Sequence, residues 1–252
     1  MKILFMTGGE REKALEYLIE KKEQISAVVT PSPSGKNNRF QNVIKKAKEN
    51  KIPTFFVDKD NVGTIIEKID FDILVSCGFS YIIDKSIISK AKYAINVHPT
   101  LLPKYRGYRS GPYILINGEK QSGVTIHFIS EEMDKGDIIL QKSFEVTPFD
   151  TSKSVYRKAR GIEPKLLYEV IQLLKTGKHK VILQNEKEAS TYNYLRTPKD
   201  SEIDWNKSLR ELYNEIRACD PVDYPAFFFV DGQKVCIKLW RPDKPEDEKD
   251  MI

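Results

Sequence analysis

The predicted fold is decided by residues 2–30, KILFMTGGEREKALEYLIEKKEQISAVVT, which place a strand, a helix and a second strand in immediate succession. Residues 2–7 form an apolar run that is typical of a buried strand. Residues 11–23 carry apolar side chains at helical spacing, and residues 25–30 form a second apolar run. Two strands joined through a helix predict a parallel pair, with the helix packed on one face of the sheet.

The same alternation continues to residue 98. The further elements are expected as helices at 40–51 and 61–70 and as strands at 53–58, 71–78 and 93–98. This order predicts an α/β fold whose mostly parallel sheet carries helices on both faces. In sheets of this kind, ligands bind at the carboxyl ends of the strands.

After His98 the pattern changes to a loop, two further strands with a long helix, and a smaller C-terminal part. The expected elements are a loop at 98–111, a short helix that ends near Gly118, strands at 122–129 and 136–146, a helix at 151–178, a loop and helix at 196–218, and a hairpin at 226–240 that turns at Asp231-Gly232. We therefore expect a core domain over 1–178 and a C-terminal extension over 179–252. The extension is expected to end in a charged tail, 242–252, without fixed structure.

The composition excludes several classes of protein. Among the 252 residues, Lys and Arg number 41 and Asp and Glu 36, so the formal net charge of +5 is too small to indicate a nucleic-acid binder. No apolar run approaches the ~18 residues of a membrane span, and no signal peptide is recognisable. The three cysteines, Cys77, Cys219 and Cys236, predict neither a disulfide scaffold nor a zinc site. We expect a cytoplasmic protein that uses no metal ion.

Polar residues at the end of strand 93–98 are the first candidates for chemistry. Asn96 and His98 lie two positions apart, so both side chains point to one face of the strand. His127 lies inside an apolar strand and is predicted to pack in the interior, whereas His179 is predicted to be solvated. Asp134 stands in a loop between two strands, where aspartate is common for turn formation alone. No nucleophile motif such as G-x-S-x-G occurs, so a set of Asn, His and Asp favours general base catalysis.

Two stretches resemble the folate-dependent formyltransferases: NVHPTLLPKYRG (96–107) and GVTIHFISEEMDKGDIILQ (123–141). The pattern of that family is an Asn, a His two positions later, a Ser- or Thr-Leu-Leu-Pro loop and an Asp; here Asp134 follows His98 by 36 positions. The resemblance implies a Rossmann-like fold, 10-formyltetrahydrofolate as the co-substrate, formyl transfer to an amine, and Asn96, His98 and Asp134 as the catalytic triad. It also implies that the pterin of the folate is held by Gly78, Phe79, Tyr81, Ile82, Ile83 and Ile88.

The acceptor amine is inferred from the C-terminal part of the chain. Its residues from 196 resemble the region after the core in the tRNA and sugar-nucleotide enzymes of the family, whereas the purine-pathway enzymes normally end earlier. Residues 196–252, 57 in all, are too few for the basic five-stranded barrel that the tRNA enzymes add. We therefore expect no nucleic acid as partner, but a dTDP- or UDP-linked amino sugar, formylated for a surface polysaccharide such as the O-antigen of lipopolysaccharide. Its diphosphate is expected to be bound by Gly8, Gly9, Arg11, Lys104, Arg106 and Arg109.

Three alternatives stay open. The acceptor can be methionyl-tRNA or glycinamide ribonucleotide, or the chain can be a folate- or nucleotide-binding protein without activity. The hairpin at 226–240 has apolar faces that need a partner surface. Because a C-terminal hairpin commonly joins the subunits of the sugar enzymes, the resemblance predicts a homodimer through this hairpin.

Overall fold

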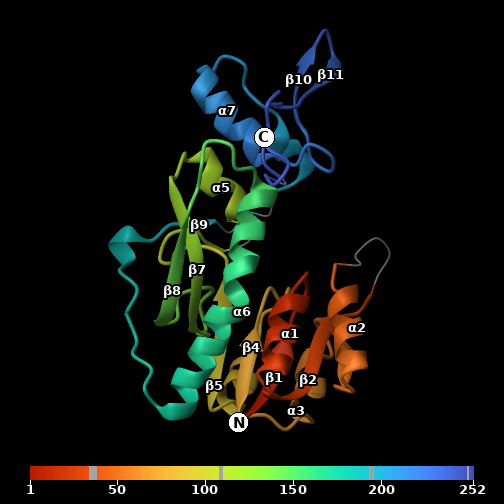
Figure 1. Cartoon of the computed structure of the whole chain (residues 1–252), viewed down its shortest axis with the longest axis vertical. Helices are drawn as coiled ribbons and strands as arrows, with labels where there is room; N and C mark the ends of the chain where they lie inside the picture. Colours follow the sequence, from red (N-terminus) through yellow and green to blue (C-terminus); the bar gives the residue numbers. More distant parts are fainter. Residues whose placement is uncertain (34–38, 108–109, 193, 195, 249) are drawn as a thin grey trace. The chain divides into compact units, whose positions relative to one another are not determined.

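The computed structural model describes residues 1–252 except 34–38, 108–109, 193, 195 and 249 (Figure 1). Its main feature is a seven-stranded sheet with the strand order β3-β2-β1-β4-β5-β7-β8. The strands of this sheet are β1 (Lys2–Met6), β2 (Gln24–Pro31), β3 (Thr54–Val57), β4 (Ile73–Ser76), β5 (Tyr93–His98), β7 (Gln121–Phe128) and β8 (Ile138–Glu145). The first five strands pair in parallel, and β7 pairs antiparallel with β5. The predicted α/β fold with a mostly parallel sheet is confirmed.

Helices connect the parallel strands and flank the sheet. They are α1 (Glu12–Glu20), α2 (Gln41–Glu49), α3 (Val62–Glu67), α4 (Lys85–Lys90), α5 (Gly111–Ile116), α6 (Ser152–Thr176) and α7 (Leu209–Ala218), with short 3-10 helices at Glu186–Glu188 and Pro198–Ser201. The long helix predicted at 151–178 forms as α6. Thr151 Oγ1 accepts a hydrogen bond from the Ser154 amide at its start, and Gly177, with φ +66°, follows its end. In the described part of the chain, no helix combines the length and the apolar character that a membrane crossing needs.

The strand order reverses between β1 and β4. From β1 the chain proceeds outward to β2 and β3, and it then returns to β4 and β5 on the other side of β1. The segments that follow β1 and β4 are joined by two backbone hydrogen bonds, from Cys77 N to Met6 O (2.8 Å) and from Gly8 N to Gly78 O (3.0 Å). In open α/β sheets, the crevice beyond the carboxyl ends of the strands at such a reversal is the usual ligand site.

The described residues form two compact units that interleave along the chain. The first unit comprises Met1–His98, Val124–Lys142 and Arg160–Asn185, and the second comprises Pro99–Gly123, Ser143–Ala159 and Glu186–Ile252. Three elements, β7, β8 and α6, therefore contribute residues to both units. The predicted division into a core over 1–178 and a C-terminal extension over 179–252 stays a prediction.

The second unit contains the predicted hairpin, formed by β10 (Ala226–Val230) and β11 (Gln233–Ile237). Asp231 and Gly232 connect the two strands with φ angles of 48° and 76°, so both residues adopt the left-handed conformation of a type I′ turn. The same unit holds a short parallel pair that the sequence did not predict, β6 (Arg106–Gly107) and β9 (Thr191–Tyr192).

The charged tail at 242–252 differs from the expectation. Ile252 is 8% exposed, and its amide donates a hydrogen bond to the Phe149 carbonyl at 2.9 Å. The ammonium of Lys244 donates to the Met251 carbonyl. The expectation of an unstructured tail is not met at the end of the chain, because Ile252 is buried and its backbone is hydrogen-bonded to Phe149.

Candidate active site

Pairing between β5 and β7 sets the positions of the candidate side chains. Asn96 lies opposite His127, and His98 lies opposite Thr125. Because β-strand side chains alternate between the two faces, Asn96 and His98 share a face with their neighbours directly across the ladder. The antiparallel register therefore brings a second histidine beside the predicted pair.

Asp134 reaches the same place from the loop between β7 and β8. Its φ angle is 56°, an uncommon backbone conformation that aspartate tolerates better than most residues. Two residues later the loop passes so close to β7 that a Cβ on Gly136 would lie 1.7 Å from the Phe128 carbonyl oxygen. The side-chain amide of Gln184 donates to the carbonyls of Asp134 (2.7 Å) and Gly136 (2.8 Å). These contacts fix the loop, and with it the carboxylate.

The Asp134 carboxylate lies between two imidazoles and an amide. Its Oδ2 lies 3.5 Å from His98 Nδ1, and its Oδ1 lies 3.5 Å from His127 Nε2. Asn96 Nδ2 donates to Asp134 Oδ1 at 3.3 Å and contacts His127 Nε2 at 3.2 Å. The structure therefore brings together all three residues of the predicted triad and adds His127.

The hydrogen-bond partners indicate which ring nitrogens carry protons. His127 Nδ1 lies 2.8 Å from the Phe128 carbonyl, which can only accept, so Nδ1 is the donor. In the neutral ring, His127 Nε2 is then the acceptor for the Asn96 amide. His98 turns Nδ1 toward a carboxylate, so a neutral His98 carries its hydrogen there and has its lone pair on Nε2. Such a ring can accept a proton at Nε2 while Asp134 stabilises the resulting charge.

Burial distinguishes this cluster from an ordinary surface group. His98 is 5% exposed and His127 2% exposed, and the Asp134 side chain is 10% exposed. Electrostatic interactions are stronger in such surroundings than in water, since little solvent is present to screen them. The arrangement can thus hold a reacting carbonyl beside a proton acceptor and an amide donor.

His127 and Gln184 belong to the cluster but were not predicted as functional. The sequence predicts a packed His127, and the residue is indeed buried, but its role as a neighbour of Asn96 follows from the strand register. Gln184 lies 50 positions beyond Asp134 and has no sequence motif. Only the fold brings it to the loop, so no signal in the sequence identifies it.

The segment predicted to hold a pterin lies after β4 in the first unit. Gly78 adopts φ +72°, and Phe79, Tyr81, Ile83 and Ile88 pack, half-buried, against the apolar core. Ile82 differs, because it is 73% exposed. The helix α4 within this segment was not predicted. The residues offer an apolar surface and a glycine turn, which fits a flat heteroaromatic ring.

The residues predicted to bind a diphosphate belong to both units. Gly8, Gly9 and Arg11 belong to the first unit, and the Arg11 guanidinium forms an ion pair with Glu163. Two further residues belong to the second unit: Lys104, which is exposed, and Arg106, which is 1% exposed and forms an ion pair with Glu186. Arg109 lies outside the described residues. Arg106 is thus a buried cation that is paired within the second unit.

Covalent catalysis by cysteine is not supported at this site. Burial raises the pKa of the Cys77 thiol to about 12, so the residue is not a thiolate at neutral pH. Among the residues that the structure describes, no group of three or more His, Cys, Asp or Glu side chains is arranged to hold a metal ion.

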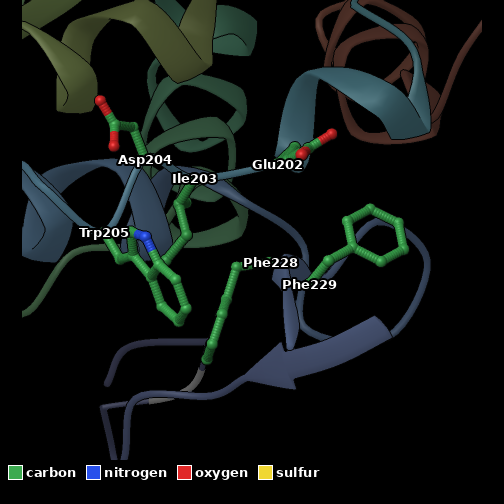
Figure 2. A pocket seen from close by; sticks show the side chains of 6 residues that line it. All are labelled: Glu202, Ile203, Asp204, Trp205, Phe228 and Phe229. Atoms are coloured by element: carbon green, nitrogen blue, oxygen red, sulfur yellow. The ribbon is translucent and has the colours of Figure 1, made fainter. Parts of the chain in front are cut away.

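An open groove of about 490 Å³ lies in the second unit (Figure 2). It is lined by Glu202, Ile203, Asp204, Trp205, Phe228 and Phe229. The rings of Trp205 and Phe228 have their centroids 5.1 Å apart, whereas the carboxylates of Glu202 and Asp204 point away from these rings (Figure 2). The groove contains none of the predicted catalytic residues.

Known proteins match the chain over nearly its whole length. Residues 1–171 match the family model described as formyl transferase, and residues 196–251 match the formyl transferase C-terminal domain. The methionyl-tRNA formyltransferase of Alkaliphilus oremlandii is 34% identical over 98% of this chain and 82% of its own length. That of Fusobacterium nucleatum is 33% identical over 94% and 78%.

Solved structures with similar folds include N-formyltransferases. A 4-N formyltransferase from Francisella tularensis has a TM-score of 0.77 and 26% identity over 94% of this chain and 96% of its own. An N-formyltransferase from Helicobacter canadensis, in complex with folinic acid and dTDP-3-aminofucose, has a TM-score of 0.73 and 22% identity over 93% and 85%.

The sequence comparison overturns the expected amino-sugar acceptor. The matching methionyl-tRNA formyltransferases share 31–34% identity over nearly the full chain, whereas the two solved N-formyltransferases share 22–26%. The expectation depended on the 57 residues after 195, but the place where a sequence ends says nothing about acceptor chemistry. It is therefore wrong, and the alternative acceptor methionyl-tRNA is better supported.

The close passage of Gly136 beside β7 predicts an effect on stability. We expect Gly136→Ala to lower the free energy of unfolding by about 1–3 kcal/mol, because the new Cβ meets backbone that cannot move aside. The matched control is Gly161→Ala in α6, where a Cβ meets nothing within 4 Å. It should stabilise the protein by about 0.5–1 kcal/mol through helix propensity. Urea denaturation measures both, and a Gly136→Ala protein as stable as wild type contradicts the described loop.

Proposed function

The chain belongs to the formyl transferase family and is an N-formyltransferase, and from that premise we propose that it transfers the formyl group of 10-formyltetrahydrofolate to the amine of methionyl-tRNA. One observation carries the choice of acceptor: identity of 34% to a methionyl-tRNA formyltransferase, over 98% of this chain. Relatives from several other bacteria with the same name share 31–33% identity.

The folate donor is supported by the surface after β4. The half-buried apolar residues from Phe79 to Ile88 and the glycine turn at Gly78 suit a pterin ring. Solved structures with this fold were obtained with folinic acid or with a formyl-tetrahydrofolate, and we extend this ligand class to the present chain. When bound, such a donor supplies a formyl carbonyl that an amine can attack.

We assign the proton acceptor role to His98. The attacking amine must lose a proton as its nitrogen bonds to the formyl carbon, and the folate nitrogen must gain one as its bond to that carbon breaks. His98 Nε2 can carry a proton between these two positions, because Asp134 lies on the Nδ1 side of the ring and favours the charged form. The exchange consumes and releases no net proton.

We assign the stabilisation of the carbonyl oxygen to Asn96. Negative charge develops on that oxygen during the attack, and an amide N–H is a suitable donor for it. In the structure, Asn96 Nδ2 contacts both Asp134 and His127. We therefore infer that Asn96 exchanges one of these contacts for the reacting oxygen, while the other keeps its side chain in position.

The cellular setting of the proposal follows from its acceptor. Aminoacyl-tRNA is used where translation takes place, so we place the enzyme in the cytoplasm, and the free cysteines Cys77, Cys219 and Cys236 suit a reducing compartment.

A homodimer through the β10–β11 hairpin stays a prediction. Phe229, Val230 and Val235 of this hairpin are 39–47% exposed, which gives such an interface an apolar surface.

Removal of either catalytic side chain should abolish most of the activity. We expect Asn96→Ala and His98→Ala each to lower kcat by at least ~10² while the fold is kept, because each removes a group that acts on the reacting atoms. Time courses of product formation with 10-formyltetrahydrofolate and methionyl-tRNA, quenched at intervals, measure kcat. Circular dichroism checks the fold. Asn42→Ala, an exposed asparagine of α2, is the control and should be unaffected. Turnover within a few-fold of wild type excludes the assigned roles.

The acceptor is tested with a panel of amines. The protein is incubated with 10-formyltetrahydrofolate and one of three acceptors: charged initiator methionyl-tRNA, glycinamide ribonucleotide or a set of amino-sugar nucleotides. Absorbance follows the formation of tetrahydrofolate, and mass spectrometry identifies the formylated product. We expect turnover with methionyl-tRNA.

The other results of this panel contradict the proposal in different ways. Turnover with a sugar nucleotide or with glycinamide ribonucleotide, but not with methionyl-tRNA, shows a different acceptor for the same chemistry. Turnover with none of the three, in a folded protein that binds folate, shows a binding protein without transferase activity.

A further inference from the structure

A buried ion pair lies next to the turn that follows β4. The catalytic steps described above do not use it. Arg11, at the start of α1, has a side chain that is 10% exposed, and Glu163, in α6, has one that is 1% exposed. Arg11 Nε lies 2.9 Å from Glu163 Oε2. Charged side chains are rarely buried to this degree unless they are paired, as these two are.

The Arg11 guanidinium contacts the turn at Gly78. A Cβ built on Gly78 would lie 3.4 Å from Arg11 Nη2 and 3.6 Å from Arg11 Cζ, so the flat guanidinium covers the glycine. Gly78 has φ +72°, and its carbonyl accepts a hydrogen bond from the Gly8 amide. The turn therefore has a special backbone conformation, and Arg11 lies against it at the point where the strand order reverses.

The ion pair is poorly suited to contribute stability alone. Burial raises the pKa of Glu163, and the charges of Arg11 and, to a smaller extent, Arg160 oppose that rise. Within the described part of the chain, Glu163 Oε1 is buried without a hydrogen-bond partner. A protein with a buried ion pair is often no more stable than a variant with apolar side chains of similar size in its place. The reason is that removing the two charges from water costs about as much free energy as their attraction provides. A role in positioning nearby groups explains this buried pair better than a contribution to stability does.

A second ion pair joins the same two segments and serves as a comparison. Glu10, next to Arg11, forms an ion pair with Arg160, three residues before Glu163 in α6. Both of these side chains are exposed, at 46% and 38%. The three atoms that a Cβ on Gly78 would meet first all belong to Arg11, so the two pairs share their segments but differ in their position against the turn.

We propose that the Arg11–Glu163 pair is a positioning device that holds the Gly78 turn in the conformation that receives the folate donor. The inference rests on the proposed function, since it concerns the donor site of that reaction. Glu163 orients the guanidinium from α6, and the guanidinium in turn fixes the backbone of the turn. Neither residue touches the reacting atoms, so both act on donor affinity rather than on the chemical step.

The test replaces the pair by apolar side chains of similar size. The double variant Arg11→Met/Glu163→Leu should keep a midpoint of urea unfolding at or above that of wild type. Its dissociation constant for 5-formyltetrahydrofolate, measured by titration calorimetry, should rise about tenfold or more. The reason is that a small displacement of the turn moves the groups that contact the folate away from it. The KM for the acceptor and kcat at saturating donor should stay within about twofold, since a positioning residue of the donor site does not act on chemistry.

Two further variants keep the proposal testable if the double variant does not fold. Arg11→Lys keeps the charge but loses the flat group over Gly78, and we expect it to fold and to bind the folate several-fold more weakly. Glu10→Gln breaks only the exposed pair and should bind the folate as wild type does.

The outcomes separate this inference from the proposed function. Wild-type affinity in Arg11→Lys or in the double variant overturns the positioning role, and so does an equal loss of affinity in Glu10→Gln. A wild-type protein that does not bind 5-formyltetrahydrofolate overturns the folate donor itself. Weaker binding in the two Arg11 variants, with Glu10→Gln unchanged, supports the inference.

Discussion

The antiparallel pairing of β7 with β5 is the constraint on which the candidate site depends. It places His127 opposite Asn96, and it directs the chain into the short loop that returns Asp134 to the same place. The loop can pass this close to β7 only because residue 136 has no side chain. A shift of one residue in this register would turn the polar groups of β7 to the opposite face of the sheet.

Polar contacts that are distant in sequence then hold the carboxylate in position. Gln184 binds the loop through two carbonyls, and Asn96 binds the carboxylate directly. Because the histidines are almost inaccessible to solvent, these contacts are worth more than they would be at a surface. A site prepared in this way needs little rearrangement when charge develops on a substrate, which is the main electrostatic contribution that an enzyme can make.

Local patterns predicted the parallel strands, the long helix α6 and the β10–β11 hairpin, because these depend on periodicity and turn chemistry within short windows. The Asn96, His98 and Asp134 set came from a motif. The proximity of His127 and Gln184 could not be predicted, since it depends on pairing between segments far apart in the chain. The pairing of Arg106 with Glu186 could not be predicted for a similar reason, because Glu186 lies 80 positions away. The acceptor was misjudged because chain length was used as a measure of substrate chemistry.

The central claim is that formyl transfer takes place beside Asn96, His98 and Asp134. A crystal structure of the protein with 5-formyltetrahydrofolate tests it most directly. We expect the pterin to lie against the residues after Gly78 and the formyl-bearing end of the folate to point at the end of β5, with about 3–3.5 Å between its reacting region and the side chains of Asn96 or His98. A folate that binds elsewhere, with its formyl group away from the end of β5, contradicts the account.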